Sequence, residues 1–225
     1  MSDKRYFKRA INLPFLYKFA FYIRREKFFK LFIENIRPFS HEKIIDLGVF
    51  SGNEEKDHNF FEELYEYKHN ITACGIDDAS FLEKTYPGLK FVKIIPGEKL
   101  PFKDNEFDIG FSNAVIEHVG SFKEQEFFLK ELIRVSGRVF VGTPNRFFPL
   151  EFHVLLPFLH WLPKPVFRRI LKKIKLDFYS KEENLNLLRK SEMLELVPPS
   201  YRDKVELQNY RLFGMVSNLF LIIRK

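Results

Sequence analysis

Residues 43–53 of the chain read KIIDLGVFSGN. The first half has the pattern of a short buried strand, which ends at Asp46 and runs into a turn at Gly48. Ligands of open parallel α/β sheets bind at the carboxyl ends of the strands, and glycine there lets the backbone approach a ligand closely. Because many α/β proteins contain such a turn, the segments on either side decide what it means.

Strand and helix patterns alternate along the rest of the chain. Alternating strands and helices imply a doubly wound, mostly parallel α/β sheet, here of seven strands. Gly214 separates the last two strands by so little that they form a hairpin, which makes them antiparallel neighbours at one edge. Helices are expected over residues 15–36, 54–67, 79–86, 122–135 and 187–196, and further strands over 71–76, 91–95, 107–112, 138–141, 204–213 and 217–223.

Two parts of the chain fall outside this alternation. Residues 1–40 are expected to form an N-terminal helical segment that covers the sheet, ahead of a domain over residues 41–225. Within that domain, residues 145–186 are rich in Phe, Leu, Pro and basic residues. We expect them to form an inserted helical lid that binds the substrate. With 225 residues, 45% of them hydrophobic and 30% charged, the chain suits one globular domain.

The composition also limits where the protein works. Its single cysteine, Cys74, excludes an internal disulfide and fits a reducing cytosol. No apolar run reaches transmembrane length, and the charged N-terminus has no signal-peptide core. We expect a cytoplasmic protein, or one that is peripheral at the inner face of a membrane.

The net charge of +7 is unevenly distributed along the chain. Residues 1–45 carry 11 Lys/Arg and 4 Asp/Glu (+7), residues 46–145 carry 11 and 18 (−7), and residues 146–181 carry 8 and 2 (+6). Such basic segments have two explanations. They are solvated helix faces, or they bind an anionic partner such as a lipid headgroup or a phosphorylated carrier. Because both basic segments also contain many aromatic residues, peripheral contact with an anionic membrane is one expectation, and a helix that merely covers the sheet is the other.

Further motifs follow the later strands. After Asp46 and Asp77 come LPF at residues 100–102, DNEFD at 104–108 and NAVIEHV at 113–119. Together these motifs resemble the class I S-adenosylmethionine (SAM)-dependent methyltransferases, specifically the type 11 methyltransferase group, over roughly residues 40–145. The resemblance implies a Rossmann-like sheet whose last strand is antiparallel, SAM as cofactor, and methylation of a small-molecule, glycan or lipid-linked acceptor, with O-methylation expected.

The resemblance also implies which residues hold the cofactor. A carboxylate at Asp77 can accept both ribose hydroxyls, although Asp is equally common as a helix N-cap. Asp46 can order the turn, meet the methionine amine through water or satisfy loop amides, and residues 96–100 lie where the family holds adenine. The expected set is Asp46, Gly48, Gly52, Asp77, Asp78, Gly97, Glu98 and Asn113.

Two residues depart from the family pattern. Phe50 stands at the middle glycine of the usual Gly-x-Gly-x-Gly turn, and Pro96 replaces the usual adenine-binding aspartate. A bulky ring can narrow the methionine pocket, and the proline side chain cannot accept a hydrogen bond from the adenine amino group. A catalytically degenerate methyltransferase-fold protein that binds or acts as a scaffold is therefore the alternative function.

His153, Glu151 and His118 are the candidates for catalysis, because a hydroxyl acceptor needs a base and histidine titrates near neutral pH. A structural role for each remains the alternative. The histidines at 41, 58 and 69 form no metal-ligand pattern, so no metal is expected. A dehydrogenase would show G-x-G-x-x-G, which is absent. The SNAV sequence at 112–115 stands where base-flipping enzymes carry Asn/Asp-Pro-Pro-Tyr/Phe, so no nucleic-acid partner is expected.

Overall fold

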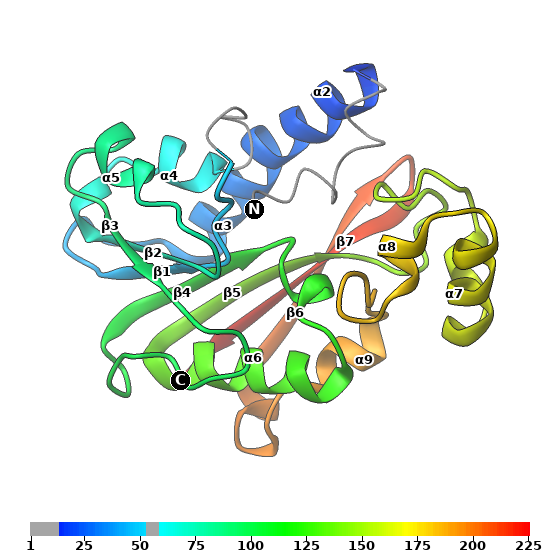
Figure 1. The fold of residues 1–225 in the computed structure, drawn as a ribbon. Helices are drawn as coiled ribbons and strands as arrows, with labels where there is room; N and C mark the ends of the chain where they lie inside the picture. Colours follow the sequence, from blue (N-terminus) through cyan, green and yellow to red (C-terminus); the bar gives the residue numbers. More distant parts are fainter. Residues whose placement is uncertain (1–13, 53–58) are drawn as a thin grey trace.

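A single seven-stranded sheet organises the chain in a computed structural model, which describes residues 14–52 and 59–225 (Figure 1). The strand order is β3-β2-β1-β4-β5-β7-β6, and β7 runs antiparallel to both of its neighbours while the other pairings are parallel. The expected doubly wound, mostly parallel sheet with an antiparallel last strand is confirmed. The strands are β1 (Ile44–Leu47), β2 (Ile71–Gly75), β3 (Lys90–Lys93), β4 (Phe107–Asn113), β5 (Ser136–Pro144), β6 (Val205–Leu212) and β7 (Met215–Arg224).

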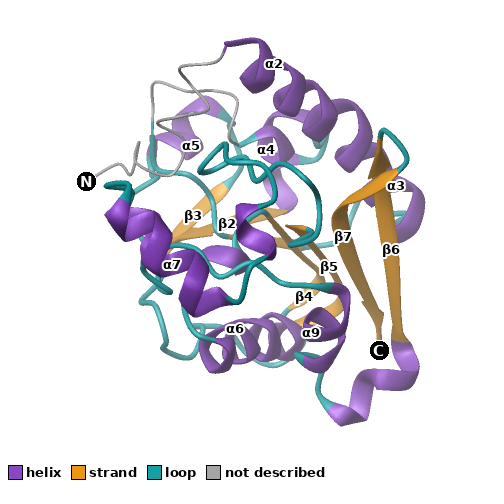
Figure 2. Cartoon of the chain, turned by 90° about the vertical axis from the view of Figure 1, so that its right-hand side faces the viewer, coloured by secondary structure: helices purple, strands orange, loops and turns teal. Residues whose placement is uncertain are grey.

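Helices cover both faces of this sheet (Figure 2). Successive residues of β1 show why: Ile44 packs into one hydrophobic cluster and Ile45 into another, and both are fully buried. Strands covered on both faces read as continuous apolar runs. One cluster includes α2 (Pro14–Ile23), η1 (Arg24–Phe28), α3 (Phe29–Ile36), α4 (Phe60–Leu64) and α5 (Phe81–Thr85), and the other includes α6 (Phe122–Val135) and α9 (Lys190–Glu195).

The helical pattern over residues 15–36 forms a continuous helical segment in which η1 is a π-helical turn. Phe32 on α3 is fully buried and points edge-on at three aromatic rings, those of Phe61, Phe111 and Phe140, with centroids 5.2, 5.3 and 5.5 Å away. Such edge-to-face contacts add to the free energy gained from burying the ring. Phe32 therefore ties the N-terminal helices to the middle of the sheet.

Several element bounds differ from the sequence prediction. β5 is longer than residues 138–141, because its antiparallel pairing with β7 extends to Pro144. The helix expected from 187 begins at Lys190, because Leu188 forms a bridge to Asn145 in an extended conformation. The helix expected over 54–67 is seen at α4 alone, and its part through residue 58 lies outside the described residues.

Residues 145–186 form an irregular segment, as their composition suggested. It contains η4 (Leu159–Trp161), α7 (Lys164–Lys173) and α8 (Asp177–Ser180), and its apolar side chains build a third hydrophobic cluster. Phe167 and Leu171 on α7 are buried in that cluster, so these two residues do not face a membrane. Phe28 and Phe32 in the N-terminal helices are likewise buried against the sheet, whereas Phe15 and Tyr22 are exposed.

Replacing Phe32 with alanine tests this attachment. Phe32→Ala should lower the free energy of unfolding by about 3–5 kcal/mol, the range for truncating a buried phenylalanine. Phe15→Ala is the matched control, because the Phe15 ring is 80% exposed and should change stability by less than about 0.5 kcal/mol. Urea unfolding followed by circular dichroism measures both variants, and equal stabilities for the two would contradict the packing described.

Candidate active site

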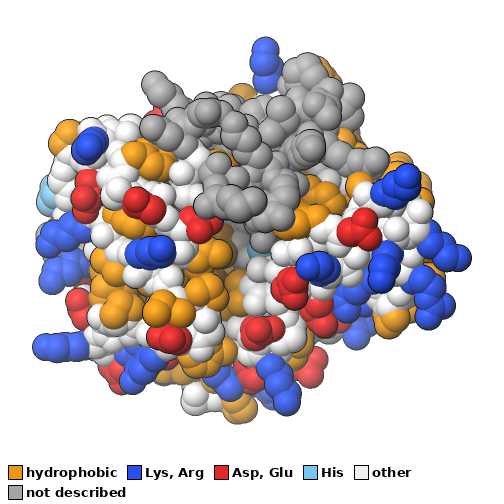
Figure 3. Space-filling model, in the orientation of Figure 1, with side chains coloured by type: hydrophobic (Ala, Val, Ile, Leu, Met, Phe, Trp, Pro, Cys, Tyr) orange, Lys and Arg blue, Asp and Glu red, His pale blue; other side chains and the backbone are white. Residues whose placement is uncertain are grey.

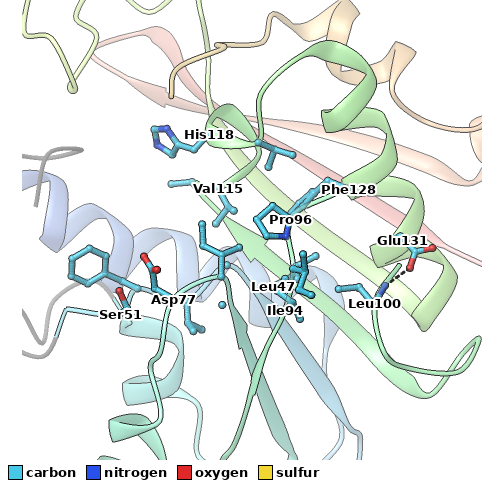
Figure 4. Close-up of a pocket in the computed structure, with 18 of the residues that line it drawn as sticks. Leu47, Ser51, Asp77, Ile94, Pro96, Leu100, Val115, His118, Phe128 and Glu131 are labelled. Atoms are coloured by element: carbon cyan, nitrogen blue, oxygen red, sulfur yellow. Dashed lines mark hydrogen bonds between the residues drawn. The ribbon is translucent and has the colours of Figure 1, made fainter. Parts of the chain in front are cut away.

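A cavity of about 340 Å³ opens at the carboxyl ends of β1, β2 and β4, next to the chain that follows β3. Its volume falls within the range of small-molecule and cofactor sites. Figure 4 shows Asp77 and Ser51 at one end of this cavity and Pro96 and Phe128 at the other. This cavity is called the cofactor cavity below.

Gly48 forms the turn at the centre of the cofactor cavity. Its φ of +112° is a conformation that L side chains rarely adopt, and its N–H donates to the Cys74 carbonyl at 2.8 Å. A Cβ at this position would lie 2.4 Å from a methyl carbon of Val115. Glycine is therefore required both for the turn and for the close approach of the loop after β4.

Phe50, the departure from the glycine-rich pattern, is held by hydrogen bonds on both sides of its backbone. The side chain of Asn59 accepts from the Phe50 N–H at 2.8 Å and donates to the Phe50 carbonyl at 3.0 Å. The Phe50 ring lines the cavity and lies against Gly52, where a Cβ would come within 2.2 Å of it. Gly52 does not line the cavity, and it leaves room for the ring of Phe50 beside it.

Asp46 lies beneath the turn and not in the cavity wall. Burial raises the pKa of Asp46 well above its usual range, and the nearby carboxyl of Glu62 raises this pKa further. Glu62 on α4 is also fully buried, and burial raises its pKa as well. Because two buried carboxyls in contact cannot both ionise cheaply, the pair holds a proton between them. In the structure Asp46 thus links β1 to α4, the role of a residue that orders the turn.

The two aspartates after β2 have different surroundings. Asp77 lines the cofactor cavity. Asp78 does not, and its carboxylate accepts a hydrogen bond from the Ser80 N–H at 2.9 Å. This bond lowers the pKa of Asp78. Of the two, only Asp77 is placed to meet a ligand in this cavity.

The opposite end of the cavity is apolar, with Ile94, Pro96, Leu100 and Phe128 in its wall (Figure 4). Gly97 and Glu98 line the same end. These side chains form the kind of flat, apolar slot that accepts an aromatic ring.

The loop at this end is fixed by α6. Glu131 accepts from the Leu100 N–H at 2.8 Å, drawn as a dashed line in Figure 4. Arg134 donates to Glu131 and also to the carbonyls of Leu100 and Phe102. The Arg134 guanidinium, together with the Leu100 N–H, offsets the effect of burial and lowers the pKa of Glu131. The backbone that lines the apolar end is therefore held at several points by one helix.

The chain after β4 brings a charged cluster to the edge of the cofactor cavity. Asn113 lines the cavity, and Ala114 adopts φ +57°, an uncommon conformation for a residue with a Cβ. The turn leads into η3 (Ile116–His118), where Glu117 is fully buried and His118 lines the cavity.

The 145–186 segment completes this cluster. The ring of His153 lies edge-on to that of His118, with centroids 4.7 Å apart, and its Nδ1 contacts a carboxylate oxygen of Glu151. Glu151 and His153 line a second, smaller cavity of about 70 Å³, to which Arg24 and Ala114 also contribute. Because Arg24 and Ala114 line the cofactor cavity as well, the two cavities share a wall.

Burial controls the protonation of the two histidines. Burial and the neighbouring His153 together lower the pKa of His118 to about 3, so that His118 is neutral at physiological pH. Burial alone would lower the pKa of His153 as well, but the carboxylates of Glu151 and Glu117 outweigh that effect and raise it. The site therefore pairs a neutral histidine beside the cofactor cavity with a more basic histidine behind it.

Some residues of the site were not found from the sequence. From the sequence, the Glu117–His118 pair could be catalytic or could hold the loop at a helix start, and Glu117 was not among the predicted catalytic residues; in the structure it is buried and accepts a hydrogen bond from the Thr143 hydroxyl at 2.9 Å. Arg24 lies on the N-terminal segment, far along the chain from the motifs. The sequence did contain a signal for Glu117, because it is a carboxylate within the mostly apolar stretch that follows β4.

Comparisons with known proteins bear on the class of this site. Residues 58–138 match the family model of a methyltransferase domain, the type 11 methyltransferase model. A search of curated protein sequences found no match. Among solved structures, similar folds include a SAM-dependent methyltransferase from Aquifex aeolicus (11% identity, covering 90% of this chain and 92% of that one, TM-score 0.53).

Two further structures share the fold at similar distance. Magnesium protoporphyrin IX methyltransferase from Synechocystis PCC 6803, with S-adenosylhomocysteine (SAH) bound, is 10% identical over 87% of this chain and 80% of that one, with a TM-score of 0.52. A Rhodobacter sphaeroides protein described as a Zn-dependent alcohol dehydrogenase is 13% identical over 87% of each chain, with a TM-score of 0.58. At such low identities the structural similarity shows the fold alone. The match to the methyltransferase-domain model is what favours methyl transfer over alcohol dehydrogenation.

The resemblance to the type 11 group is confirmed by these findings. The chain carries a methyltransferase domain on the fold of the class I SAM-dependent methyltransferases, and SAM is the cofactor of that class.

The contrast between the two aspartates gives a test of the cofactor site. Asp77→Ala should weaken SAH binding by about 1.5–3 kcal/mol, because it removes a charged hydrogen-bond acceptor from the cavity wall. Asp78→Ala is the control and should bind SAH as the wild type does. Isothermal titration calorimetry measures both affinities, and an Asp78→Ala variant as weak as Asp77→Ala would contradict this arrangement.

Proposed function

We propose that the protein transfers the methyl group of SAM to a hydroxyl oxygen of a small-molecule, glycan or lipid-linked acceptor. The observation that carries the proposal is the pair of cavities with a shared wall, one of cofactor size and one small, with a histidine–carboxylate cluster between them. The cofactor would occupy the larger cavity, and the acceptor group would enter the smaller one.

The cofactor has a defined orientation in this proposal. The ribose lies at Asp77, the methionine part passes Gly48 and Asn113, and the adenine enters the apolar end beside Gly97 and Glu98. Asp46, Gly52 and Asp78 shape the surrounding turns without lining the cavity. This orientation directs the sulfonium methyl toward the loop after β4.

For this reaction the protein must align the acceptor with the cofactor and activate the acceptor hydroxyl. Methyl transfer is an in-line displacement at carbon, so holding the oxygen, the methyl carbon and the sulfur in a line supplies much of the rate. A hydroxyl becomes a good nucleophile when its proton is withdrawn as it attacks. We assign that activation to His118 and His153, with Glu151 orienting His153.

Turnover and cofactor affinity together test this assignment. His118→Ala and His153→Ala should lower turnover by about 10²–10⁴-fold, the range for general acid–base groups, with SAH affinity nearly unchanged. His41→Ala is the control, because His41 is exposed and lines neither cavity. The assay measures SAH released from SAM over a panel of monosaccharide acceptors, free and linked to polyprenyl phosphate.

Two results would count against the proposal. If the wild type does not bind SAH at millimolar concentration, the protein is a non-catalytic scaffold that has kept the fold. If His118→Ala and His153→Ala turn over as fast as His41→Ala, the cluster takes no part in the reaction.

We also propose a peripheral contact with an anionic membrane through the 145–186 segment, since this region exposes aromatic and basic side chains together. Phe147, Phe158 and Trp161 are 47%, 53% and 42% exposed. Figure 3 shows Lys and Arg side chains gathered on the side of the molecule that carries α7. None of the helices in the described part of the chain is long and apolar enough to cross a membrane.

Vesicle co-sedimentation tests this contact. Binding to phosphatidylserine vesicles should weaken as salt rises, because each exposed basic residue contributes about 1 kcal/mol of screened attraction. Trp161→Ser should reduce binding, whereas Phe39→Ser, which removes an exposed ring elsewhere, should not. Equal absence of the protein from anionic and neutral vesicles at low salt would exclude the contact.

A further inference from the structure

Three side chains from distant parts of the sequence meet beside the cofactor cavity. Glu117 and His118 come from η3, and His153 comes from the 145–186 segment. One ligand atom of each, a carboxylate oxygen or a ring nitrogen, lies within 4.8 Å of the other two. The separation between His118 Nε2 and Glu117 Oε1 is 4.0 Å. Zinc bonds to nitrogen and oxygen are about 2.0–2.2 Å long, so two ligand atoms on opposite sides of one ion lie about 4 Å apart.

Each of the three side chains is also oriented by a polar contact at the atom that would not bind the metal. His118 Nδ1 lies 2.7 Å from the Asn184 carbonyl, which can only accept, so Nδ1 carries the proton and the lone pair of the neutral ring is on Nε2. His153 is bound at Nδ1 by Glu151, and that carboxylate accepts in turn from the His153 and Val154 N–H groups at 2.8 Å. Histidine ligands of metals are held in this way, by a carboxylate or a backbone carbonyl on the other ring nitrogen.

The two carboxylate oxygens of Glu117 also have different surroundings. Its Oε2 accepts from the Thr143 hydroxyl at 2.9 Å, whereas its Oε1 is buried and has no hydrogen-bond partner among the described residues. An ionised carboxylate oxygen buried without a partner costs free energy, and coordination to a cation removes that cost. The second carboxylate, Glu151, adds negative charge behind His153, and the positive charge of Arg24 also acts on both histidines.

We propose that Glu117, His118 and His153 form a divalent metal site at the wall between the two cavities, and that the metal takes the acceptor hydroxyl as a further ligand. Two histidines and one carboxylate are a frequent ligand set for zinc and for other first-row transition ions. Three protein ligands leave at least one coordination position open. Since His118 lines one cavity and Glu117 and His153 line the other, an ion held by all three lies where cofactor and acceptor meet.

In this inference the metal ion, and not direct proton uptake by a histidine, activates the acceptor hydroxyl. This step rests on the proposed function. Coordination lowers the pKa of the hydroxyl, and its proton passes to water. The oxygen lone pair then forms the new bond to the methyl carbon while the sulfur–carbon bond electrons return to sulfur. The products are the methyl ether, the neutral thioether SAH and one proton.

Metal binding can be measured without knowing the acceptor. The protein is first stripped with a chelator and then titrated with Zn²⁺ in a calorimeter, and its metal content is confirmed by elemental analysis. One ion per chain should bind, and Glu117→Gln and His153→Gln should each weaken its affinity by at least about tenfold. His69→Gln is the matched control, because His69 is exposed and outside the cluster.

A spectroscopic measurement on the wild type covers the case in which a cluster variant fails to fold. Co²⁺ bound by nitrogen and oxygen ligands in a four- or five-coordinate site gives strong visible absorption, whereas hydrated Co²⁺ gives little. A stoichiometric visible spectrum that Zn²⁺ abolishes supports the site. A wild type that binds neither ion at micromolar concentration, or a His69→Gln variant as weak as the cluster variants, overturns it.

SAH titration separates this inference from the proposed function. A protein that binds SAH and no metal keeps the function and loses the metal site. A protein that binds one metal ion through the cluster and no SAH keeps the metal site and loses the methyltransferase role.

Discussion

The close contact between Gly48 and Val115 governs the arrangement of the site. At Gly48 the backbone after β1 donates to the end of β2 and touches the loop after β4, so three strand ends are fixed at one point. The loop after β4 then turns at Ala114 and delivers Glu117 and His118. A side chain at position 48 would separate these strand ends, and the positions of the cavity and the cluster would both change.

The sheet beneath the N-terminal helices and the 145–186 segment differ in how many apolar side chains they bury. The face under the N-terminal helices is packed by contacting aromatic rings, including the stacked pair Phe61 and Phe111, with centroids 4.2 Å apart. The 145–186 segment has only a small core of its own and connects to the sheet through a few bonds such as that from Asn186 N to the Glu117 carbonyl. Segments with few buried contacts open at lower free energy than the core, so we expect this segment to open more readily than the sheet beneath the N-terminal helices.

The sequence predicted the doubly wound, mostly parallel sheet and most elements because these depend on local apolar periodicity and on turn residues, as at Ile44 and Ile45 on opposite faces of β1. It favoured Asp77 as the ribose ligand but kept Asp78 in the expected cofactor set, because a local pattern does not show which of two neighbouring side chains faces a cavity. Nor could it place His153 against His118, because that contact depends on how an irregular segment folds back over the sheet.

Ala114 contributes to the walls of both cavities while its backbone is left-handed. Side chains that tolerate this conformation are few: glycine, asparagine and aspartate adopt it most readily, and branched residues are strongly disfavoured. The choice of residue at this position is therefore limited by backbone geometry before any substrate is considered. At this point of the shared wall the side chain is a single methyl group, and the larger side chains that suit this backbone are the short polar ones of asparagine and aspartate.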